Sequence, residues 1–418
     1  MSSGSGVAMH GVGKQTLVNG EIVESVKTVS LLFRVAVARD SAGQQDLSRC
    51  EDAEPVCQAI SGNRLLLGVA DGLGGYALGF DNRSGGQIAA STAIDAAVDY
   101  FRDSDPDAEA DAEALTNLVF KQLRYLSETK LPPSRVRGTL GRHRLATTLA
   151  LAVVHPARDL LVRRVECYWI GDSRIYFLGT NALRQLSQDD NLTGSDAFQS
   201  VLDPPPMSQF LAASMEREWR LNLCEFYLDC PGVLFLCSDG CYSEFENPWQ
   251  FEAGLQQALE NSESWHSWIE CLRLRFADGC SDDASCAVFP VGMENFSEFK
   301  RSRRSNASHG LLGRCMAAES AADLTPEEIW SRIYQPVYET LPGRLPGDMG
   351  DGSYKDVREE AEATEHPRFL VRWSGASRQW ELFLAWLLGF VLATTLSGPI
   401  MFWARVFWDG FKSLWQNI

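Results

Sequence analysis

The sequence of 418 residues predicts an α+β fold built on antiparallel sheets. Two observations predict it: strand-like apolar segments come in pairs and runs, and pairs of amphipathic helices separate these runs. The regular alternation of single strands and helices that indicates a parallel sheet is not the observed pattern. A hydrophobic content of 45% and a charged content of 22% are those of an ordinary globular protein.

The individual elements are predicted from periodicity and boundary residues. Strands are expected at 29–38, 145–154, 165–170, 175–178 and 284–290, and further apolar runs end at Asp71 and Asp239. Stripes of apolar residues at helical spacing predict helices at 88–101, 115–126, 247–259 and 265–276. Asn247 and Pro248 supply an N-cap and a first-turn proline for the third of these helices.

Composition divides the chain into parts. We expect a flexible arm at 1–27, the main domain at 28–292, a mostly flexible linker at 293–378 and a membrane anchor at 379–408. Within the linker, Thr325 begins a capping box followed by proline, so one short helix is expected there. The basic cluster of Arg301, Arg303 and Arg304 is expected to be a solvated face, with contact to anionic lipid as the alternative.

The anchor is predicted from residues 382–403, which contain no charged side chain and are long enough to cross the hydrocarbon core. Aromatic residues mark its ends, and Arg378 and Arg405 flank it. The alternatives are a buried C-terminal helix and an amphipathic helix lying in the membrane plane. The N-terminus lacks an apolar signal-peptide core. Because only a short tail follows the span, a spanning segment predicts a single-pass protein with its main domain in the cytoplasm, beside Arg368, Arg372 and Arg378.

Charge and cysteine usage exclude some classes of protein. The formal net charge of −17 argues against nucleic acid as a partner, because its phosphates would be repelled. Eleven cysteines occur without a CxxC motif or a Cys/His cluster, which indicates a reducing compartment and argues against a zinc site.

Four aspartates, each set against a strand-like run, carry the functional prediction. They are Asp71, Asp172, Asp239 and Asp282. A carboxylate at a strand end beside glycine can reach a small hard cation while the backbone turns away. One such aspartate would indicate only a turn. Four of them predict that several strands deliver carboxylates to one divalent-metal site.

Six short motifs carry a family resemblance. They are DGLGG at 71–75, ATTL at 146–149, GDSR at 171–174, LSQD at 186–189, SDG at 238–240 and DDAS at 282–285. In this order they resemble the metal-dependent protein phosphatases, the type 2C serine/threonine phosphatases, over residues 29 to 291. Asp283 departs from the asparagine that the family has at that position.

The resemblance implies a four-layer α-β-β-α sandwich of two antiparallel sheets flanked by helices, with Mn²⁺ or Mg²⁺ at one end. It implies two ions with a possible third. By matching positions, the implied catalytic metal ligands are Asp52, Asp71, Asp239 and Asp282, with the carbonyl of Gly72. Asp172 matches a position that helps to hold the third, weaker ion. Glu51 would support Asp52 from behind.

Hard oxygen ligands suit Mg²⁺ and Mn²⁺, and two such ions can activate a shared water and neutralise phosphoryl oxygens. The implied nucleophile is therefore a metal-bridging water. Ser173, Ser238 and Ser285 have no base at motif spacing, so covalent serine catalysis fits poorly. Arg174 is expected to be structural, bonding turn carbonyls.

Two departures concern phosphate capture. Leu47 stands where the family has a phosphate-binding arginine, and the nearest substitute is Arg49. Asp190 stands where the family has a histidine, so a bound water or another histidine such as His143 would protonate the leaving group.

The predicted function is hydrolysis of phosphoserine and phosphothreonine in proteins at the cytoplasmic face of a membrane. The expected partners are phosphoproteins and a membrane-associated Ser/Thr kinase system. The rival is a pseudophosphatase that binds phosphoproteins without turnover, which Leu47 and Asp190 favour. Hydrolysis of a small phosphate ester is a further alternative.

Overall fold

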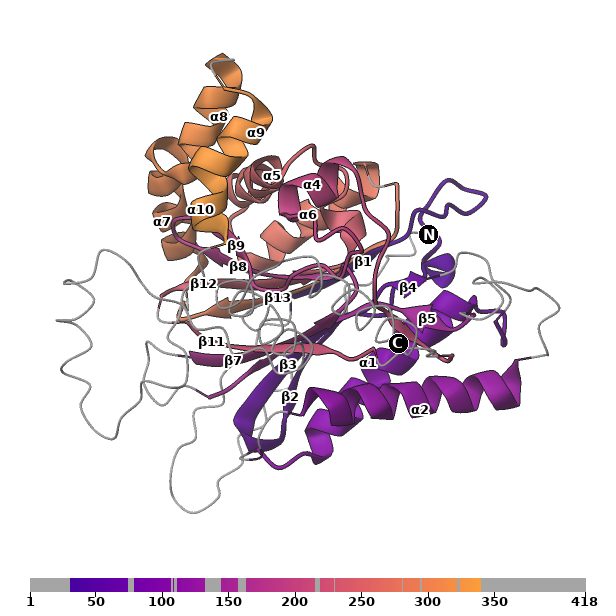
Figure 1. The fold of residues 1–418 in the computed structure, drawn as a ribbon. Coiled ribbons are helices and arrows are strands. Elements are labelled where there is room, and N and C mark those ends of the chain that lie inside the picture. The colour runs from indigo at the N-terminus through magenta and orange to yellow at the C-terminus, as the bar shows by residue number, and fades with distance from the viewer. Residues whose placement is uncertain are drawn as a thin grey trace, which may run out of the picture. The chain divides into compact units, whose positions relative to one another are not determined.

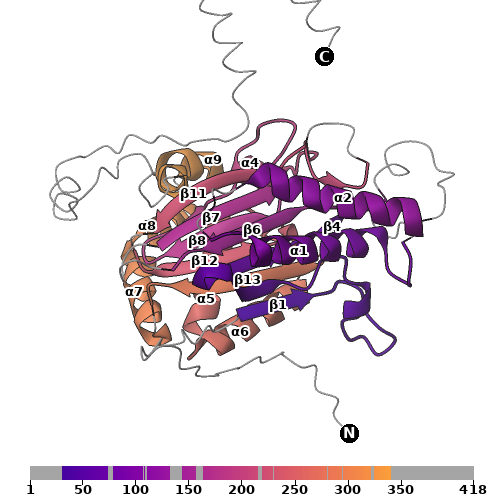
Figure 2. The same cartoon turned by 90° about the horizontal axis from the view of Figure 1, so that it is seen from below.

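Two five-stranded antiparallel sheets face each other in the computed structural model (Figure 1). The structure describes residues 31–73, 79–106, 108, 111–131, 144–156, 163–214, 219–228, 230–279, 281–293, 295–321 and 324–339. Helices cover the outer face of each sheet, so the layers are helix, sheet, sheet and helix (Figures 1 and 2). The predicted α+β class and antiparallel sandwich are confirmed for these residues.

The first sheet contains, in spatial order, β1 (Leu31–Val35), β13 (Ala284–Val291), β12 (Gly232–Cys237), β8 (Arg174–Gly179) and β9 (Leu183–Gln185). The second contains β11 (Asn222–Leu228), β7 (Arg163–Ile170), β6 (Leu149–Val154), β3 (Arg64–Val69) and β2 (Val56–Ile60). A small third sheet contains β10 (Leu211–Ala212), β5 (Ala146–Thr147) and β4 (Gly72–Leu73). All neighbouring strands in these sheets are antiparallel.

The central strands are apolar on both faces because both faces are buried. In β3, Leu65 and Leu67 point into the core between the sheets, where Phe177 and Leu236 meet them from the first sheet. Leu66 points the other way, into the core beneath the helices. Successive side chains of a strand alternate in direction, so the run RLLLGV serves two cores at once.

Helices α1 (Gly85–Asp103) and α2 (Ala112–Lys130) cover the second sheet, and α5 (Pro248–Glu260) and α6 (Trp265–Gly279) cover the first (Figure 1). Ser84 closes a capping box at the start of α1, and Asn247 caps α5 ahead of its first-turn proline, as predicted. The shorter elements are η1 (Leu47–Arg49), η2 (Ser61–Asn63), α4 (Ala197–Leu202) and η3 (Asp239–Cys241).

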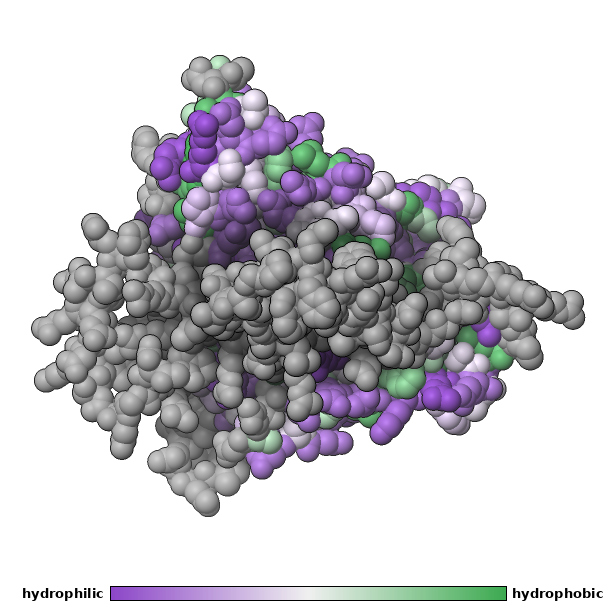
Figure 3. Space-filling view, viewed as in Figure 1, coloured by the Kyte–Doolittle hydropathy of each residue, from purple (hydrophilic) through white to green (hydrophobic). Residues whose placement is uncertain are grey.

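Residues 296–339 correct the expectation of a flexible linker in this part of the chain. They form α7 (Phe296–His309), α8 (Leu311–Ala321), α9 (Pro326–Ile329), η4 (Trp330–Tyr334) and α10 (Gln335–Tyr338). Their aromatic side chains Phe299, Trp330 and Tyr334 are buried in the core that also holds Trp249 of α5. The outer surface of this helical group is mainly hydrophilic, with scattered hydrophobic residues (Figure 3). The capping box at Thr325 is present as predicted.

Arg303 corrects the expectation of a wholly solvated basic cluster. Its guanidinium is 2% exposed and lies 2.7 Å from a carboxylate oxygen of Glu252, which is fully buried in α5. It also donates to the carbonyl of Gly179. Arg301 and Arg304 are exposed. Arg303 therefore docks α7 on the domain.

No helix among residues 31–339, where the structure describes them, is long and apolar enough to cross a membrane. The expected arm at 1–27, the anchor at 379–408 and its span 382–403 lie outside the described residues, as does His143.

Candidate metal centre

The five candidate aspartates all lie at one end of the sandwich because of strand polarity. Asp71 follows the end of β3, and Asp52 precedes β2, whose first residue pairs with Gly68 of β3. In the other sheet, Asp239 follows β12 and Asp282 precedes β13, and these two strand ends pair through Cys237 and Cys286. Asp172 lies in the turn between β7 and β8, next to the same edge.

The backbone around Asp71 is fixed by Thr147 at the end of β5 and by Thr148, which lies between β5 and β6. The Asp71 N–H donates to Thr148 Oγ1 at 3.2 Å, and Thr147 Oγ1 donates to the Asp71 carbonyl at 2.6 Å. A Cβ added at Gly72 would lie 2.5 Å from the carbonyl oxygen of Glu51. Only glycine therefore allows the two acidic segments to approach this closely.

Asp52 is bridged to the opposite sheet by a buried serine. Asp52 is only 1% exposed, and Ser238 Oγ donates to Asp52 Oδ2 at 2.7 Å. Ser238 Oγ in turn accepts from the N–H of Ser285 at 2.9 Å. The serine of the SDG motif is thus a support for Asp52. From the sequence, Ser238 was considered only as a possible nucleophile, and its support of Asp52 was not predicted.

Asp283 joins three segments behind the centre. Its Oδ2 accepts from the Glu51 N–H at 2.6 Å, and its Oδ1 accepts from the Val37 N–H at 2.8 Å. A Cβ added at Gly240 would lie 2.1 Å from the Asp283 carbonyl, so the loops of the two motifs pack directly on each other. The charged residue in place of the family's asparagine receives two backbone N–H groups, which stabilises a carboxylate.

The Asp172 turn is held from several sides. Gly171 has φ +92°, a conformation that favours glycine. Its N–H donates to Asp190 Oδ2 at 3.0 Å, and its carbonyl accepts from the Asp190 N–H at 2.9 Å. Tyr242 Oη donates to the Asp172 carbonyl at 2.8 Å. Asp190 thus holds this turn from the position where the family has its histidine.

Arg174 is structural, as expected, but its main partner differs from the prediction. The guanidinium is 1% exposed and forms a bidentate pair with Asp189, with Nη2 to Oδ2 at 2.6 Å. Its central carbon lies 3.7 Å from the centroid of the Tyr242 ring. The pair and the cation–π contact fix β8 against the loop that follows Asp239.

Burial and neighbouring negative charges raise the pKa values of the candidate aspartates. Burial raises the pKa of Asp52 to about 7, with Asp283 and Asp239 adding to the effect and Ser238 opposing it. Burial also raises the pKa of Asp71 well above its ordinary value, and the charges of Asp52, Asp239, Asp172 and Asp282 raise it further.

The remaining candidates behave in the same way. Burial raises the pKa of Asp172 to about 8, and the nearby charge of Asp239 adds to the shift. Burial and Asp282 raise the pKa of Asp239 to about 6, against hydrogen bonds from Gly240 and Asp71. Burial raises the pKa of Asp282 as well. These shifts agree with the strand pairing, which places the aspartates at one end of the sandwich.

The residues fit hard divalent cations by their chemistry. One buried oxygen in each of Asp52, Asp172 and Asp239 has no hydrogen-bond partner, although buried carboxylates ordinarily bind a donor or a cation. Among the described residues, no three His, Cys, Asp or Glu side chains are arranged so that together they could hold one metal ion. The buried oxygens of Asp52, Asp172 and Asp239 that have no hydrogen-bond partner are therefore the atoms of this region that a cation could contact.

The residues that would bind the substrate phosphate are less clearly identified than the aspartates of the carboxylate cluster. Leu47 is 42% exposed in η1, and Arg49 is exposed at the end of the same turn. Sequence reasoning missed Arg34 of β1, whose Nη1 donates to the Asp52 carbonyl at 3.0 Å and whose Nη2 lies 3.3 Å from Glu54. A charged residue within an otherwise apolar strand was the available signal.

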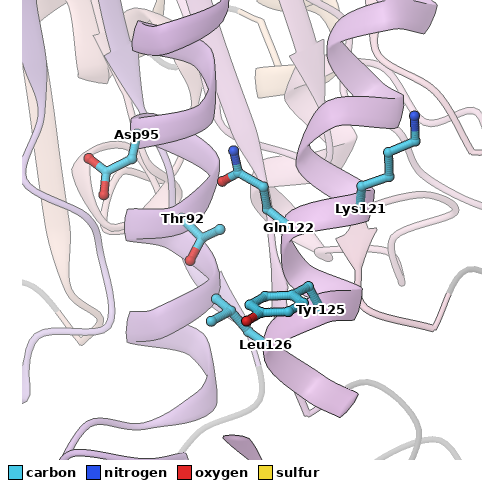
Figure 4. Close-up of a pocket in the computed structure, with 6 residues that line it drawn as sticks. All are labelled: Thr92, Asp95, Lys121, Gln122, Tyr125 and Leu126. Carbon is cyan, nitrogen blue, oxygen red and sulfur yellow. The ribbon is translucent and has the colours of Figure 1, made fainter. Parts of the chain in front are cut away.

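A pocket elsewhere on the molecule lies between α1 and α2 (Figure 4). It has a volume of about 390 Å³, and its lining residues are Thr92, Asp95, Lys121, Gln122, Tyr125 and Leu126. None of these residues is a candidate ligand. The pocket is therefore separate from the carboxylate cluster.

Comparison with known proteins gives the same family as the motifs. The family profile described as protein phosphatase 2C matches residues 41–272, more than half of the chain. A putative protein phosphatase of Mycoplasma genitalium is 27% identical over 253 residues, 57% of this chain and 88% of that protein. The serine/threonine phosphatase stp of Listeria welshimeri is 24% identical, over 43% of this chain and 67% of that protein.

A solved structure is also similar, at lower identity. The catalytic domain of the serine/threonine protein phosphatase PstP, in complex with 2 manganese ions, has 19% identity and a TM-score of 0.41, and the match covers 63% of this chain and 98% of that one. The match with the family profile ends before Asp282, which the sheet pairing brings to Asp239 independently.

Proposed function

This chain belongs to the protein phosphatase 2C family and is a protein serine/threonine phosphatase, and we propose that it uses two Mn²⁺ or Mg²⁺ ions, with a possible third. The proposed ligands are Asp52, Asp71, Asp239 and Asp282, with the Gly72 carbonyl and, for a third ion, Asp172. The observation that supports this most directly is the mutual perturbation of these aspartates at one end of the sandwich.

Ions bound there would supply Lewis-acid activation of water and neutralise charge on the phosphoryl group. The protein's own contribution is to hold acidic side chains together against repulsion. Ser238 positions Asp52, and the threonines at 147 and 148 fix the backbone of Asp71. Asp283 keeps the Glu51–Asp52 segment against the loop that carries Asp282. We propose that Glu51 supports the ligands from behind, and that Arg49 is the nearest substitute for the phosphate-binding arginine.

Hydrolysis of a phosphothreonine peptide tests the proposal. We expect turnover with Mn²⁺ and none after chelation, and we expect Asp239→Asn to lower kcat/KM by at least about 100-fold through loss of a ligand. Asp99→Asn, the same chemical change at a surface residue paired with Arg102, should retain activity. Mn²⁺-dependent peptide binding without any turnover would instead support the pseudophosphatase that exposed Leu47 favours.

We also propose that residues 382–403 tether the enzyme to a membrane, with the catalytic domain in the cytoplasm near phosphorylated membrane proteins and a Ser/Thr kinase system. The charge-free length of this segment is the basis for the proposal. A chain that ends at Arg378 should move from the membrane fraction to the soluble fraction while keeping its activity on peptides. If the shortened chain stays with the membranes, this segment is not the anchor.

A further inference from the structure

The helices that follow the sandwich reach the strand next to the Asp172 turn. Figure 1 shows α10 beside β9, and the two elements are in contact. Tyr338, the last residue of α10, is 1% exposed, and its Oη donates to Gln185 Oε1 at 2.9 Å. Arg184 Nε donates to the carbonyl of Val337 at 3.3 Å. The end of α10 is therefore joined to β9 by a side-chain and a backbone contact.

Gln185 contacts Asp189 as well as Tyr338. Its Nε2 donates to Asp189 Oδ1 at 3.0 Å. A carboxylate only accepts hydrogen bonds, so the amide must turn its NH₂ group to Asp189 and its oxygen to Tyr338. Asp189 thus sets the direction of the Gln185 amide, and Tyr338 holds the amide there by donating to its oxygen. Asp189 receives one donor from Gln185 and the bidentate guanidinium of Arg174.

The chain of contacts ends at the candidate metal centre. The guanidinium carbon of Arg174 lies 3.7 Å from the centroid of the Tyr242 ring, and Tyr242 Oη donates to the carbonyl of Asp172. Tyr242 also follows η3, the turn that begins with Asp239, and its N–H donates to the Asp239 carbonyl at 2.9 Å. Displacement of Asp189 would therefore disturb the backbone of two candidate ligands.

We propose that Tyr338 and Gln185 are positioning residues for the Asp172 turn, so that α10 seated on β9 sets the affinity for the most weakly held ion. The inference rests on the proposed function, in which Asp172 holds that ion. It assigns a role in the active site to a helix that lies outside the residues matched by the family profile.

The test compares two tyrosine-to-phenylalanine variants of the full chain. Tyr338→Phe removes the hydroxyl that contacts Gln185. Tyr334→Phe is the matched control, because Tyr334 is equally buried in the same segment but its hydroxyl donates to Glu252 at 2.6 Å rather than to Gln185. The ring of Tyr334 packs against that of Tyr338, with centroids 5.3 Å apart, and phenylalanine keeps this ring contact. Gln185→Met removes the next link without creating an unpaired buried amide.

Mn²⁺ alone is titrated and followed by electron paramagnetic resonance. We expect Tyr338→Phe and Gln185→Met to weaken the last ion to bind by about 10-fold and to leave the tighter ions unchanged, as for other residues that orient ligands. Tyr334→Phe should lower thermal stability without changing the titration. Equal titrations for all three variants and the wild type, or an equal shift in Tyr334→Phe, would overturn the proposal.

A second readout separates this inference from the proposed function. Hydrogen exchange of the peptide that covers residues 171–175 is measured without metal. Faster exchange in Tyr338→Phe and Gln185→Met than in Tyr334→Phe supports the positioning role even if no ion binds, in which case only the metal assignment fails. Equal exchange in all variants contradicts the positioning role even if the wild type is an active, Mn²⁺-dependent phosphatase.

Discussion

At the scale of single residues, Ser238 decides how Asp52 can act. The Asp52 side chain is buried, and its hydrogen bond from Ser238 Oγ opposes the rise in its pKa. Without that donor, the charged carboxylate that a cation requires becomes harder to form. Ser238 also accepts from the Ser285 N–H, so the same hydroxyl connects Asp52 to the first residues of β13.

We therefore expect Ser238→Ala to weaken Mn²⁺ binding by about 10-fold and to lower the free energy of unfolding by about 1–3 kcal/mol. Isothermal titration calorimetry and urea denaturation measure the two effects. Ser262→Ala is the control, because that buried hydroxyl donates to the carbonyl of Ala258 in α5 and not to a carboxylate. It should cost stability without changing metal affinity; a normal affinity in Ser238→Ala would refute the supporting role.

Asp71, Asp172, Asp239 and Asp282 could be selected as candidates from sequence because each stands beside a strand-like apolar run, whereas Asp52 was assigned only through the family resemblance. Their supports could not. Ser238 and Asp52 are 186 positions apart, and nothing in either neighbourhood indicates the other. The same holds for Tyr242, whose hydroxyl meets the carbonyl of Asp172 only after β8 and β12 pair.

At the scale of elements, the sandwich was predictable and the helices after it were not. The strands of both sheets are apolar runs bounded by turns, and α5 carries its own N-cap and proline. The segment 296–338 has a polar average composition, which predicts a linker. Its burial depends on a few aromatic residues and on Arg303 finding Glu252, a partner 51 positions away.

The helices after the sandwich also contact elements that flank the candidate metal centre. Trp330 Nε1 donates to Asp196 Oδ2 at 2.9 Å, at the N-cap of α4, while Tyr338 contacts β9. One C-terminal segment therefore touches two elements on either side of the Asp189–Asp190 pair. In physical terms the sandwich and the helices form one folding unit, because Glu252 would be an unpaired buried charge without Arg303.

At the scale of the whole molecule, the clustered carboxylates link stability to pH and to metal. Their folded pKa values are raised, to about 7 for Asp52, about 8 for Asp172 and about 6 for Asp239. The folded protein therefore holds more protons than the unfolded chain between the ordinary aspartate pKa and these values. Stability from this source is complete below the ordinary pKa and is lost as pH rises through about 6 to 8.

Glu166 has the opposite effect on the pH dependence of stability, and it acts over a lower pH range. Its pKa is lowered although burial opposes this, because His155, Arg164 and Tyr168 stabilise its charge. The stability that it contributes is lost only as pH falls below the ordinary glutamate value. Between pH 5.5 and 8.5 Glu166 therefore does not offset the loss of stability that comes from the aspartates.

We expect the melting temperature of the chelator-treated protein to fall by about 5 °C or more between pH 5.5 and 8.5. Mn²⁺ should bind more tightly as pH rises, because ligands must lose their protons, so the stabilisation by a fixed Mn²⁺ concentration should be largest at pH 8.5. Differential scanning calorimetry with and without Mn²⁺ measures both trends. Asp52→Asn, which removes one raised pKa and one ligand, should flatten the metal-free profile and reduce the gain from Mn²⁺. A metal-free protein that becomes more stable over this range would show that the carboxylates do not repel one another as the geometry requires, and the case for a shared cation site would lose its electrostatic basis.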